Sequence, residues 1–138
     1  MGDILGGRAA LGGAPQSDAD WHRLLERGLP YRVLRPLARW TALSDAELGG
    51  ALGIPRSTLS RRKQAGRFST GESDRIYRTA RLLSLARLAL GTPENTSAWL
   101  SEPNHALGGA TPLSLMRTEA GARQIESVLG RFLFGGYS

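Results

Sequence analysis

The sequence predicts an all-α protein, and three observations lead to that fold class. No stretch of the 138 residues alternates apolar and polar side chains convincingly enough for a β-strand. Almost every segment carries residues that cap helices, such as a serine or threonine at its start or a glycine at its end. The apolar residues of the longer segments recur at the three- and four-residue spacing of a helix. We therefore expect a succession of helices, without internal repeats.

The first 17 residues are rich in glycine and alanine and have no sustained apolar period. This composition predicts a flexible N-terminal arm over residues 1–17. Asp18 or Asp20 can then cap a short helix over residues 21–27, which Gly28 closes.

A second helix is expected after Pro30, because proline suits a helix start. The apolar residues at helical spacing in this segment are Val33, Leu34, Leu37 and Trp40. Pro36 conflicts with an unbroken helix, so it either kinks this helix or moves its start.

The central segment contains two helices with clear boundaries. Ser44 and Glu47 have the spacing of a capping box, which opens a helix that runs through residue 52 and ends at Gly53. A second helix is predicted over residues 56–65, and Gly66 stops it.

A second capping box, Ser69 with Glu72, precedes a long helix that ends at residue 90. Further helix starts are predicted at Thr92-Pro93, at Thr111-Pro112 and at Thr118. In the last helix the expected buried stripe consists of Ile125, Val128, Leu129, Phe132 and Leu133.

The net charge of +6 is concentrated in the middle of the chain. Residues 44–90 carry nine basic and four acidic side chains, whereas residues 91–138 carry three basic and four acidic ones. A basic middle predicts a polyanion-binding segment joined to a segment with another role; the alternative is a solvated basic face.

Residues 44–68 have the proportions of a helix-turn-helix, whose second helix enters the major groove of DNA. The candidate DNA-binding residues are Arg56, Ser57, Thr58, Ser60 and Arg61, which face the bases, and Arg62, Lys63 and Arg67, which face the phosphates. The apolar residues expected between the two helices are Leu48, Leu52, Ile54 and Leu59. The alternatives are an αα-hairpin with a charged surface, or a former DNA reader that now binds proteins.

Several classes of chemistry are disfavoured. The chain has no cysteine, which excludes disulfides, cysteine-zinc sites and thiol nucleophiles. His22 and His105 lie in different segments without metal-ligand spacing, and Glu119 with Glu126 are more simply two solvated acids. We therefore expect no enzyme, no cofactor and no metal. With no signal peptide and no apolar run near the roughly 20 residues of a membrane span, the expected location is the cytoplasm, without membrane contact.

The glycine pair Gly108-Gly109 resembles a loop that holds an anion, since a helix start follows it. However, no Gly-Lys-Ser/Thr follows the pair, and no lysine or arginine occurs between Thr92 and Met116. We expect a tight turn formed by Gly108, Gly109, Thr111 and Pro112.

The order of these features over residues 24–138 resembles the Xre/MbcA/ParS antitoxins of bacterial toxin-antitoxin systems. The second helix of the helix-turn-helix and the spaced C-terminal features carry the resemblance. The C-terminal features are Ala98-Trp99-Leu100, Pro103-Asn104, Leu107-Gly108-Gly109, Thr111-Pro112-Leu113, Thr118 with Gly121, and Phe134-Gly135.

The resemblance implies an Xre-like helix-turn-helix domain over residues 18–68, a connecting helix over 69–91, and a small helical toxin-binding domain over 92–138. It further implies that the partner is a RES-domain toxin that degrades NAD and is blocked at its active site by the antitoxin's C-terminal region. Members of the family commonly also bind their own operator DNA and repress the operon.

By this resemblance the toxin-binding residues are Arg131 of the last helix and the tail Phe134, Gly135, Gly136, Tyr137 and Ser138. The tail is also suited to insertion by its own chemistry, because its glycines are pliable and its terminal carboxylate can enter a cationic pocket. The alternative is that the last residues simply fray.

The large apolar residues of the C-terminal half are expected in its core: Trp99, Leu100, Leu107, Leu113 and Leu115. A homodimer is expected, because symmetric half-sites require two readers. The competing functions are a stand-alone transcription regulator, whose C-terminal domain dimerises or senses a ligand, and an enzyme that uses the Gly-Gly loop.

Overall fold

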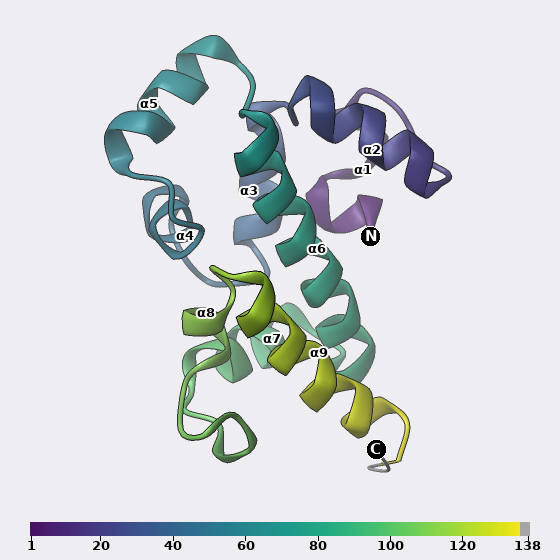
Figure 1. The fold of residues 1–138 in the computed structure, drawn as a ribbon, viewed down its shortest axis with the longest axis vertical. Helices are drawn as coiled ribbons and strands as arrows, with labels where there is room; N and C mark the ends of the chain where they lie inside the picture. Colours follow the sequence, from purple (N-terminus) through teal and green to yellow (C-terminus); the bar gives the residue numbers. More distant parts are fainter. Residues whose placement is uncertain (136–138) are drawn as a thin grey trace.

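The computed structural model describes residues 1–135, and over this range it is all-α (Figure 1). Nine α-helices and three 3-10 helices follow one another, and the described part of the chain contains no β-strand. The predicted fold class is therefore confirmed. None of the described helices is both long enough and apolar enough to cross a membrane.

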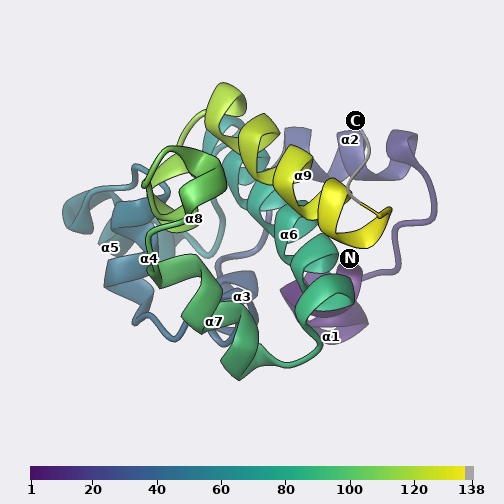
Figure 2. The same cartoon turned by 90° about the horizontal axis from the view of Figure 1, so that it is seen from below.

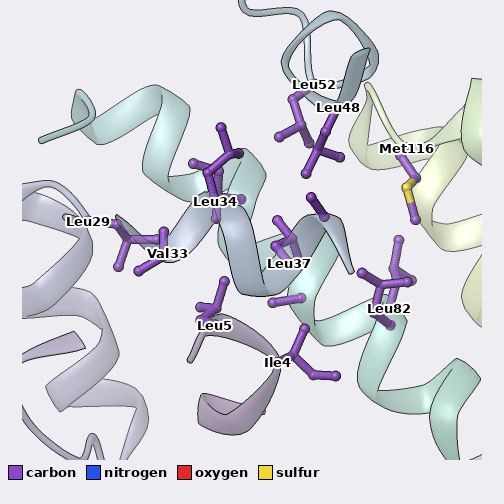
Figure 3. Packing of buried hydrophobic residues seen from close by; sticks show 14 of the residues in the cluster. Ile4, Leu5, Leu29, Val33, Leu34, Leu37, Leu48, Leu52, Leu82 and Met116 are labelled. Atoms are coloured by element: carbon purple, nitrogen blue, oxygen red, sulfur yellow. The ribbon is translucent and has the colours of Figure 1, made fainter. Parts of the chain in front are cut away.

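The prediction of a flexible arm over residues 1–17 was wrong. A 3-10 helix, η1 (Gly2–Leu5), and α1 (Gly7–Leu11) form there, and Ile4 and Leu5 are completely buried. Figure 3 shows Ile4 and Leu5 reaching towards Leu37. The Arg32 Nε donates to the carbonyl oxygen of Ala10 at 2.6 Å, which fixes the segment further. Two turns of helix are too short to show an apolar period, so composition alone could not reveal them.

Helix α2 (Asp18–Arg27) begins three residues earlier than expected, because Ser17 rather than Asp18 or Asp20 caps it. The Ser17 Oγ accepts a hydrogen bond from the backbone N–H of Asp20 at 3.1 Å. Gly28 closes the helix as predicted, with a φ of 91°.

Pro36 produces no kink, because the helix starts late enough to accommodate it. After η2 (Tyr31–Val33), α3 (Leu34–Ala38) places Pro36 in its first turn, where a backbone N–H has no partner within the helix. Of the two alternatives left open by the sequence, the shifted start is the one realised.

The helix-turn-helix forms with nearly the predicted boundaries. Helix α4 (Asp45–Ala51) carries the complete Ser44–Glu47 capping box, and α5 (Arg56–Ala65) ends at Gly66. The four apolar residues expected between the helices are all buried: Leu48, Leu52, Ile54 and Leu59.

Helix α6 (Thr70–Leu90) runs through the molecule and connects its two halves (Figure 1). It carries the second predicted capping box, Ser69 with Glu72. The C-terminal half consists of α7 (Pro93–Ser101), η3 (His105–Leu107), α8 (Pro112–Leu115) and α9 (Glu119–Leu133). Thr92, Thr111 and Thr118 cap α7, α8 and α9 as predicted. Helix α9 packs along α6 (Figure 2).

One apolar core extends through both halves, from Ile4 to Leu129. Leu100 and Leu107 are buried, and Trp99, Leu113 and Leu115 are partly buried against the core. The prediction for α9 was partly wrong. Ile125 and Leu129 are buried, but Val128 and Leu133 are only half-buried, and Phe132 is 66% exposed. The helical period gives the correct face, but it does not show how far along α9 the underlying core extends.

Candidate functional site

The turn between α4 and α5 depends on a close approach at Gly49. A Cβ at this buried position would lie 3.2 Å from Cδ2 of Leu59 on α5. The carbonyl oxygen of Gly49 also accepts the backbone N–H of Ile54 at 2.8 Å. The absence of a side chain at Gly49 therefore lets α5 pack closely on α4.

Helix α5 lies at an outer corner of the molecule (Figure 1), and only Leu59 on this helix is buried. We call its polar exposed residues the α5 surface: Arg56, Ser57, Ser60, Arg61, Lys63 and Gln64. Gln64 was missed by the sequence analysis. Its spacing of seven residues from Ser57 and three from Arg61 places it on their helical face and could have revealed it.

Two of the predicted phosphate contacts are engaged within the protein instead. The Arg62 guanidinium donates to both carboxylate oxygens of Glu72, from Nε at 2.7 Å and from Nη2 at 3.2 Å. The Nη1 of Arg67 donates to the carbonyl oxygen of Gly28 at 2.7 Å. Arg62 joins α5 to α6, and Arg67 joins the loop after α5 to the end of α2.

The Arg62–Glu72 pair is largely shielded, since the Glu72 side chain is only 8% exposed. Burial by itself raises the pKa of the Glu72 carboxyl, but the Arg62 guanidinium and the hydrogen bonds from Ser69 outweigh burial and lower this pKa below its usual value. The same hydrogen bond raises the pKa of Arg62. The pair therefore remains ionised at neutral pH and holds α5 against the first turn of α6.

The loop after α5 packs against Gly28, the residue that closes α2. A Cβ there would lie 2.1 Å from the carbonyl oxygen of Phe68. Backbone hydrogen bonds from Phe68 N to Leu29 O and from Tyr31 N to Gly66 O, both 2.9 Å, hold the two segments together. This contact fixes the loop after α5, and the Arg62–Glu72 pair fixes α5 itself.

Thr58 is half-buried, and its Oγ1 accepts a hydrogen bond from the Nη2 of Arg61 at 3.1 Å. Near the start of α5, the pKa of the Glu47 carboxyl is lowered mainly by hydrogen bonds from Ser44 and to a lesser extent by the charge of Arg56. The α5 surface thus presents three cationic side chains, those of Arg56, Arg61 and Lys63, together with short polar groups. This is the chemistry that contacts phosphates and base edges.

Gly108 and Gly109 form the predicted turn, with φ values of 68° and 87°. Gly108 N donates to His105 O at 3.1 Å, and Gly109 N donates to Asn104 O at 2.9 Å. Since both N–H groups are already bonded to backbone carbonyls, they are not free to bind an anion. Thr111 caps α8 and Pro112 occupies its first position, as expected for a turn that leads into a helix.

The C-terminal half is joined to α6 by ion pairs. Glu119 pairs with Arg78 at 3.1 Å, and Glu126 pairs with Arg81 at 2.7 Å. The two acids that the sequence analysis interpreted as solvated are therefore engaged with α6. Arg117 provides a further link, because its Nη2 donates to the carbonyl oxygen of Gly50 in α4 at 2.9 Å.

The predicted toxin-binding residues lie where α9 ends. Arg131 is exposed, Phe134 is 78% exposed, and Gly135 has a φ of 86°. Gly136, Tyr137 and Ser138 lie outside the described residues. Within residues 1–135, no group of three or more histidines or acids has the geometry to hold a metal ion.

Both halves of the chain are similar to known families of antitoxin domains. Residues 20–81 match the antitoxin Xre-like helix-turn-helix domain, and residues 84–135 match the antitoxin Xre/MbcA/ParS C-terminal toxin-binding domain. The two matches meet within α6.

Curated relatives carry the name Antitoxin Xre. The relative from Yersinia enterocolitica is 34% identical over 116 residues, which cover 83% of this chain and 78% of the relative. That from Photorhabdus laumondii is 31% identical over 114 residues, covering 81% and 77%. That from Pseudomonas putida is 32% identical over 113 residues, covering 82% and 70%.

Proposed function

Because the chain belongs to the Xre antitoxin family, and is thus a non-enzymatic antitoxin of a toxin-antitoxin system, we propose that it inhibits a RES-type toxin, an enzyme that degrades NAD. The antitoxin covers the active site of this toxin with the end of α9 and the tail. The antitoxin also represses its own operon by binding operator DNA through α5. Both roles belong to the cytoplasm, where the operator and the NAD pool are found.

The match of residues 84–135 to a toxin-binding domain is the main support for the inhibitory role. Arg131 and Phe134 are exposed at the end of this match, directly before Gly136, Tyr137 and Ser138. The tail contains Gly136, a residue type that adopts many backbone conformations, and Tyr137, whose ring and hydroxyl can contact a nucleotide-binding pocket. The same match argues against a stand-alone regulator whose C-terminal half only dimerises or senses a ligand.

The test of inhibition is an NAD-consumption assay with the purified toxin encoded in the adjacent reading frame. We expect the full chain to suppress NAD loss and a chain ending at residue 135 to leave much of the activity. The thermal unfolding of both chains should coincide, because the removed residues lie beyond α9. A toxin that leaves NAD intact, or equal inhibition by the shortened chain, contradicts the proposal.

The α5 surface supports the DNA-binding role, since its exposed cations and hydroxyls lie on the second helix of a helix-turn-helix. We propose that two copies of the chain read two half-sites as a homodimer, about one helical turn of DNA apart. Arg56, Arg61 and Lys63 supply the charge, while Arg62 and Arg67 hold α5 in place.

The DNA-binding role is tested with the DNA fragment upstream of the operon. Arg61→Ala should weaken binding by about tenfold or more, as expected for the loss of a base contact. Arg123→Ala is the matched control, because Arg123 is an exposed arginine on α9, away from α5. Equal binding by both variants and the parent chain contradicts the assignment of α5.

A further inference from the structure

Large apolar side chains are exposed at one end of the molecule. Among residues 1–135 the exposed large hydrophobic residues are Leu88, Phe132 and Phe134, at 72%, 66% and 78% exposure. Leu88 lies near the end of α6, and the two phenylalanines lie at the end of α9. We call these three residues the apolar end surface.

Ion pairs and helix geometry bring these residues to the same end. The Arg78–Glu119 and Arg81–Glu126 pairs fix α9 beside α6, and both helices run in the same direction (Figure 1). Leu88 is seven residues beyond Arg81, and Phe132 is six residues beyond Glu126. At 1.5 Å per residue, both lie about 10 Å past the same ion pair. Figure 2 also shows the ends of the two helices side by side.

Such a group differs from isolated apolar residues, which are common on protein surfaces. Several large apolar side chains exposed at the same end of a molecule, with a polar residue such as Arg131 next to Phe132 in the chain, are typical of an interaction site. Aromatic residues and arginine are also the types that contribute most to binding free energy in protein interfaces.

The position of the surface in the chain indicates its occupant. All three residues lie within residues 84–135, the part that matches a toxin-binding domain. Only four residues separate Phe134 from the end of Ser138, and four extended residues span at most about 14 Å. A tail that reaches into the toxin's active site therefore brings Phe134 and the end of α9 against the toxin surface around that site.

We propose, resting on the proposed inhibition of the toxin by the tail, that the apolar end surface is the docking anchor for the toxin. Leu88, Phe132 and Phe134 occupy an apolar hollow of the toxin beside the mouth of its active site. The anchor provides most of the affinity, and the tail provides the inhibition. Binding and inhibition are thus assigned to two adjacent but separable groups of residues.

The experiment separates affinity from maximal inhibition. Binding of the purified toxin from the adjacent reading frame is measured by calorimetry, and its residual NAD-degrading activity is measured at saturating antitoxin. The double variant Leu88→Ser/Phe132→Ser should bind about 100-fold more weakly, a loss typical of interface hot spots, yet inhibit fully at saturation. The chain ending at residue 135 should bind within about fivefold of the parent but leave residual activity at saturation.

Gln124→Ser is the matched control, because Gln124 is exposed on the same helix as Phe132 and lies outside the surface. It should bind like the parent. Leu88 and Phe132 are exposed, so the thermal unfolding of the double variant should stay close to that of the parent. Leu88→Ser alone, on the other helix, should weaken binding by about tenfold.

The experiment distinguishes failure of the docking anchor from failure of the proposed inhibition by the tail. If the double variant binds the toxin like the parent, the docking anchor is wrong, whatever the tail does. If the double variant binds weakly but the shortened chain inhibits fully, the tail proposal is wrong and the anchor stands. If the parent is a dimer that the double variant dissociates, with unchanged toxin binding, the surface is occupied by a second copy and the proposal is overturned.

Discussion

Helix α6 connects the α5 surface to the apolar end surface, and the two surfaces expose different kinds of side chain. The α5 surface exposes Arg56, Arg61 and Lys63, whereas the apolar end surface exposes a leucine and two phenylalanines. Helix α6 begins at Thr70, just after α5, and Leu88 lies 18 residues further on, about 27 Å along the helix. In the proposed functions, the chain therefore contacts DNA through charge at one surface and the toxin through apolar contact at the other.

The two halves also differ in how they are held. The helix-turn-helix half depends on Gly28, Gly49 and the Arg62–Glu72 pair, and the C-terminal half on Gly121 and the pairs between α6 and α9. Substitutions that affect one set of contacts and not the other can show whether the two surfaces are independent.

The largest effect on stability is expected for Gly121→Ala, which disrupts packing in the C-terminal half and leaves the helix-turn-helix half unchanged. A Cβ at Gly121 would lie 2.0 Å from the carbonyl oxygen of Leu115, a backbone atom that cannot move without displacing α8 from α9. We expect the free energy of unfolding to fall by about 3 kcal/mol, measured by urea denaturation. In contrast, Gly50→Ala on α4 meets nothing within 4 Å and should stabilise the protein by about 0.5 to 1 kcal/mol. Equal stability of the Gly121→Ala variant and the parent would contradict this account of α8–α9 packing.

The salt concentration should affect the two surfaces differently, because salt weakens binding between charged groups and hardly changes binding through apolar contacts. If the proposed homodimer neutralises about four phosphates in total, two through each α5 surface, raising salt from 50 to 200 mM should weaken DNA binding about 100-fold, equivalent to about 2.7 kcal/mol. Toxin binding through the apolar end surface should change by less than about threefold. Titrations of both partners at four salt concentrations measure the two slopes. Parallel slopes would show that the surfaces do not differ in the forces they use.

Arg62→Ala tests which basic residues of α5 are structural. The change leaves the buried Glu72 carboxylate without its guanidinium, so we expect a loss of about 2 kcal/mol in the free energy of unfolding. Lys63→Ala, at the next position and exposed, should change stability by less than about 0.5 kcal/mol while weakening DNA binding. Chemical denaturation of both variants provides the measurement. Equal stability of the two variants would mean that the ion pair contributes nothing to the attachment of α5.

The smallest effect on stability is expected when the pH is lowered and the Glu72 carboxylate becomes protonated. The pKa of Glu72 is lowered from 4.5 in the folded protein, so its contribution to stability is present above the unfolded value and is lost as pH falls through the folded value. Glu72→Gln should therefore be less stable than the parent at pH 7, and this difference in the free energy of unfolding should narrow as the pH falls below 4.5. Thermal unfolding between pH 7 and pH 3 measures it. A difference that stays constant over this range would argue against an ionised pair.

Local signals in the sequence predicted most of the fold. The two capping boxes predicted the starts of α4 and α6, and the threonine caps predicted those of α7, α8 and α9. Glycine stops predicted the ends of α5 and α6. These signals are local, because the capping hydrogen bonds connect residues only three or four apart. The glycine turn at Gly108 and Gly109 was recognised for the same reason. The helices within residues 1–17 were not predicted, because the burial of Ile4 and Leu5 depends on contacts with α3 and α6, which are distant in the chain.

The candidate site was predicted in part. The sequence identified α5 as the basic helix, but not that Arg62 and Arg67 are bound to Glu72 and Gly28, which lie ten and 39 residues away in the chain. It assigned Phe132 to the core because the helical period continues to the end of α9. In the structure the core ends before Phe132, which leaves this side chain exposed.

The sequence by itself determined the helical class, the helix-turn-helix and the order of features that identifies the family, since caps, turns and periods are short-range. Only the tertiary structure decided which cations are free and which apolar side chains are covered. Both depend on whether another element lies against the helix, as α6 lies against Arg62 and no described element covers Phe132. Contacts between residues far apart in the chain have no local pattern, and the two surfaces of this antitoxin are defined by such contacts.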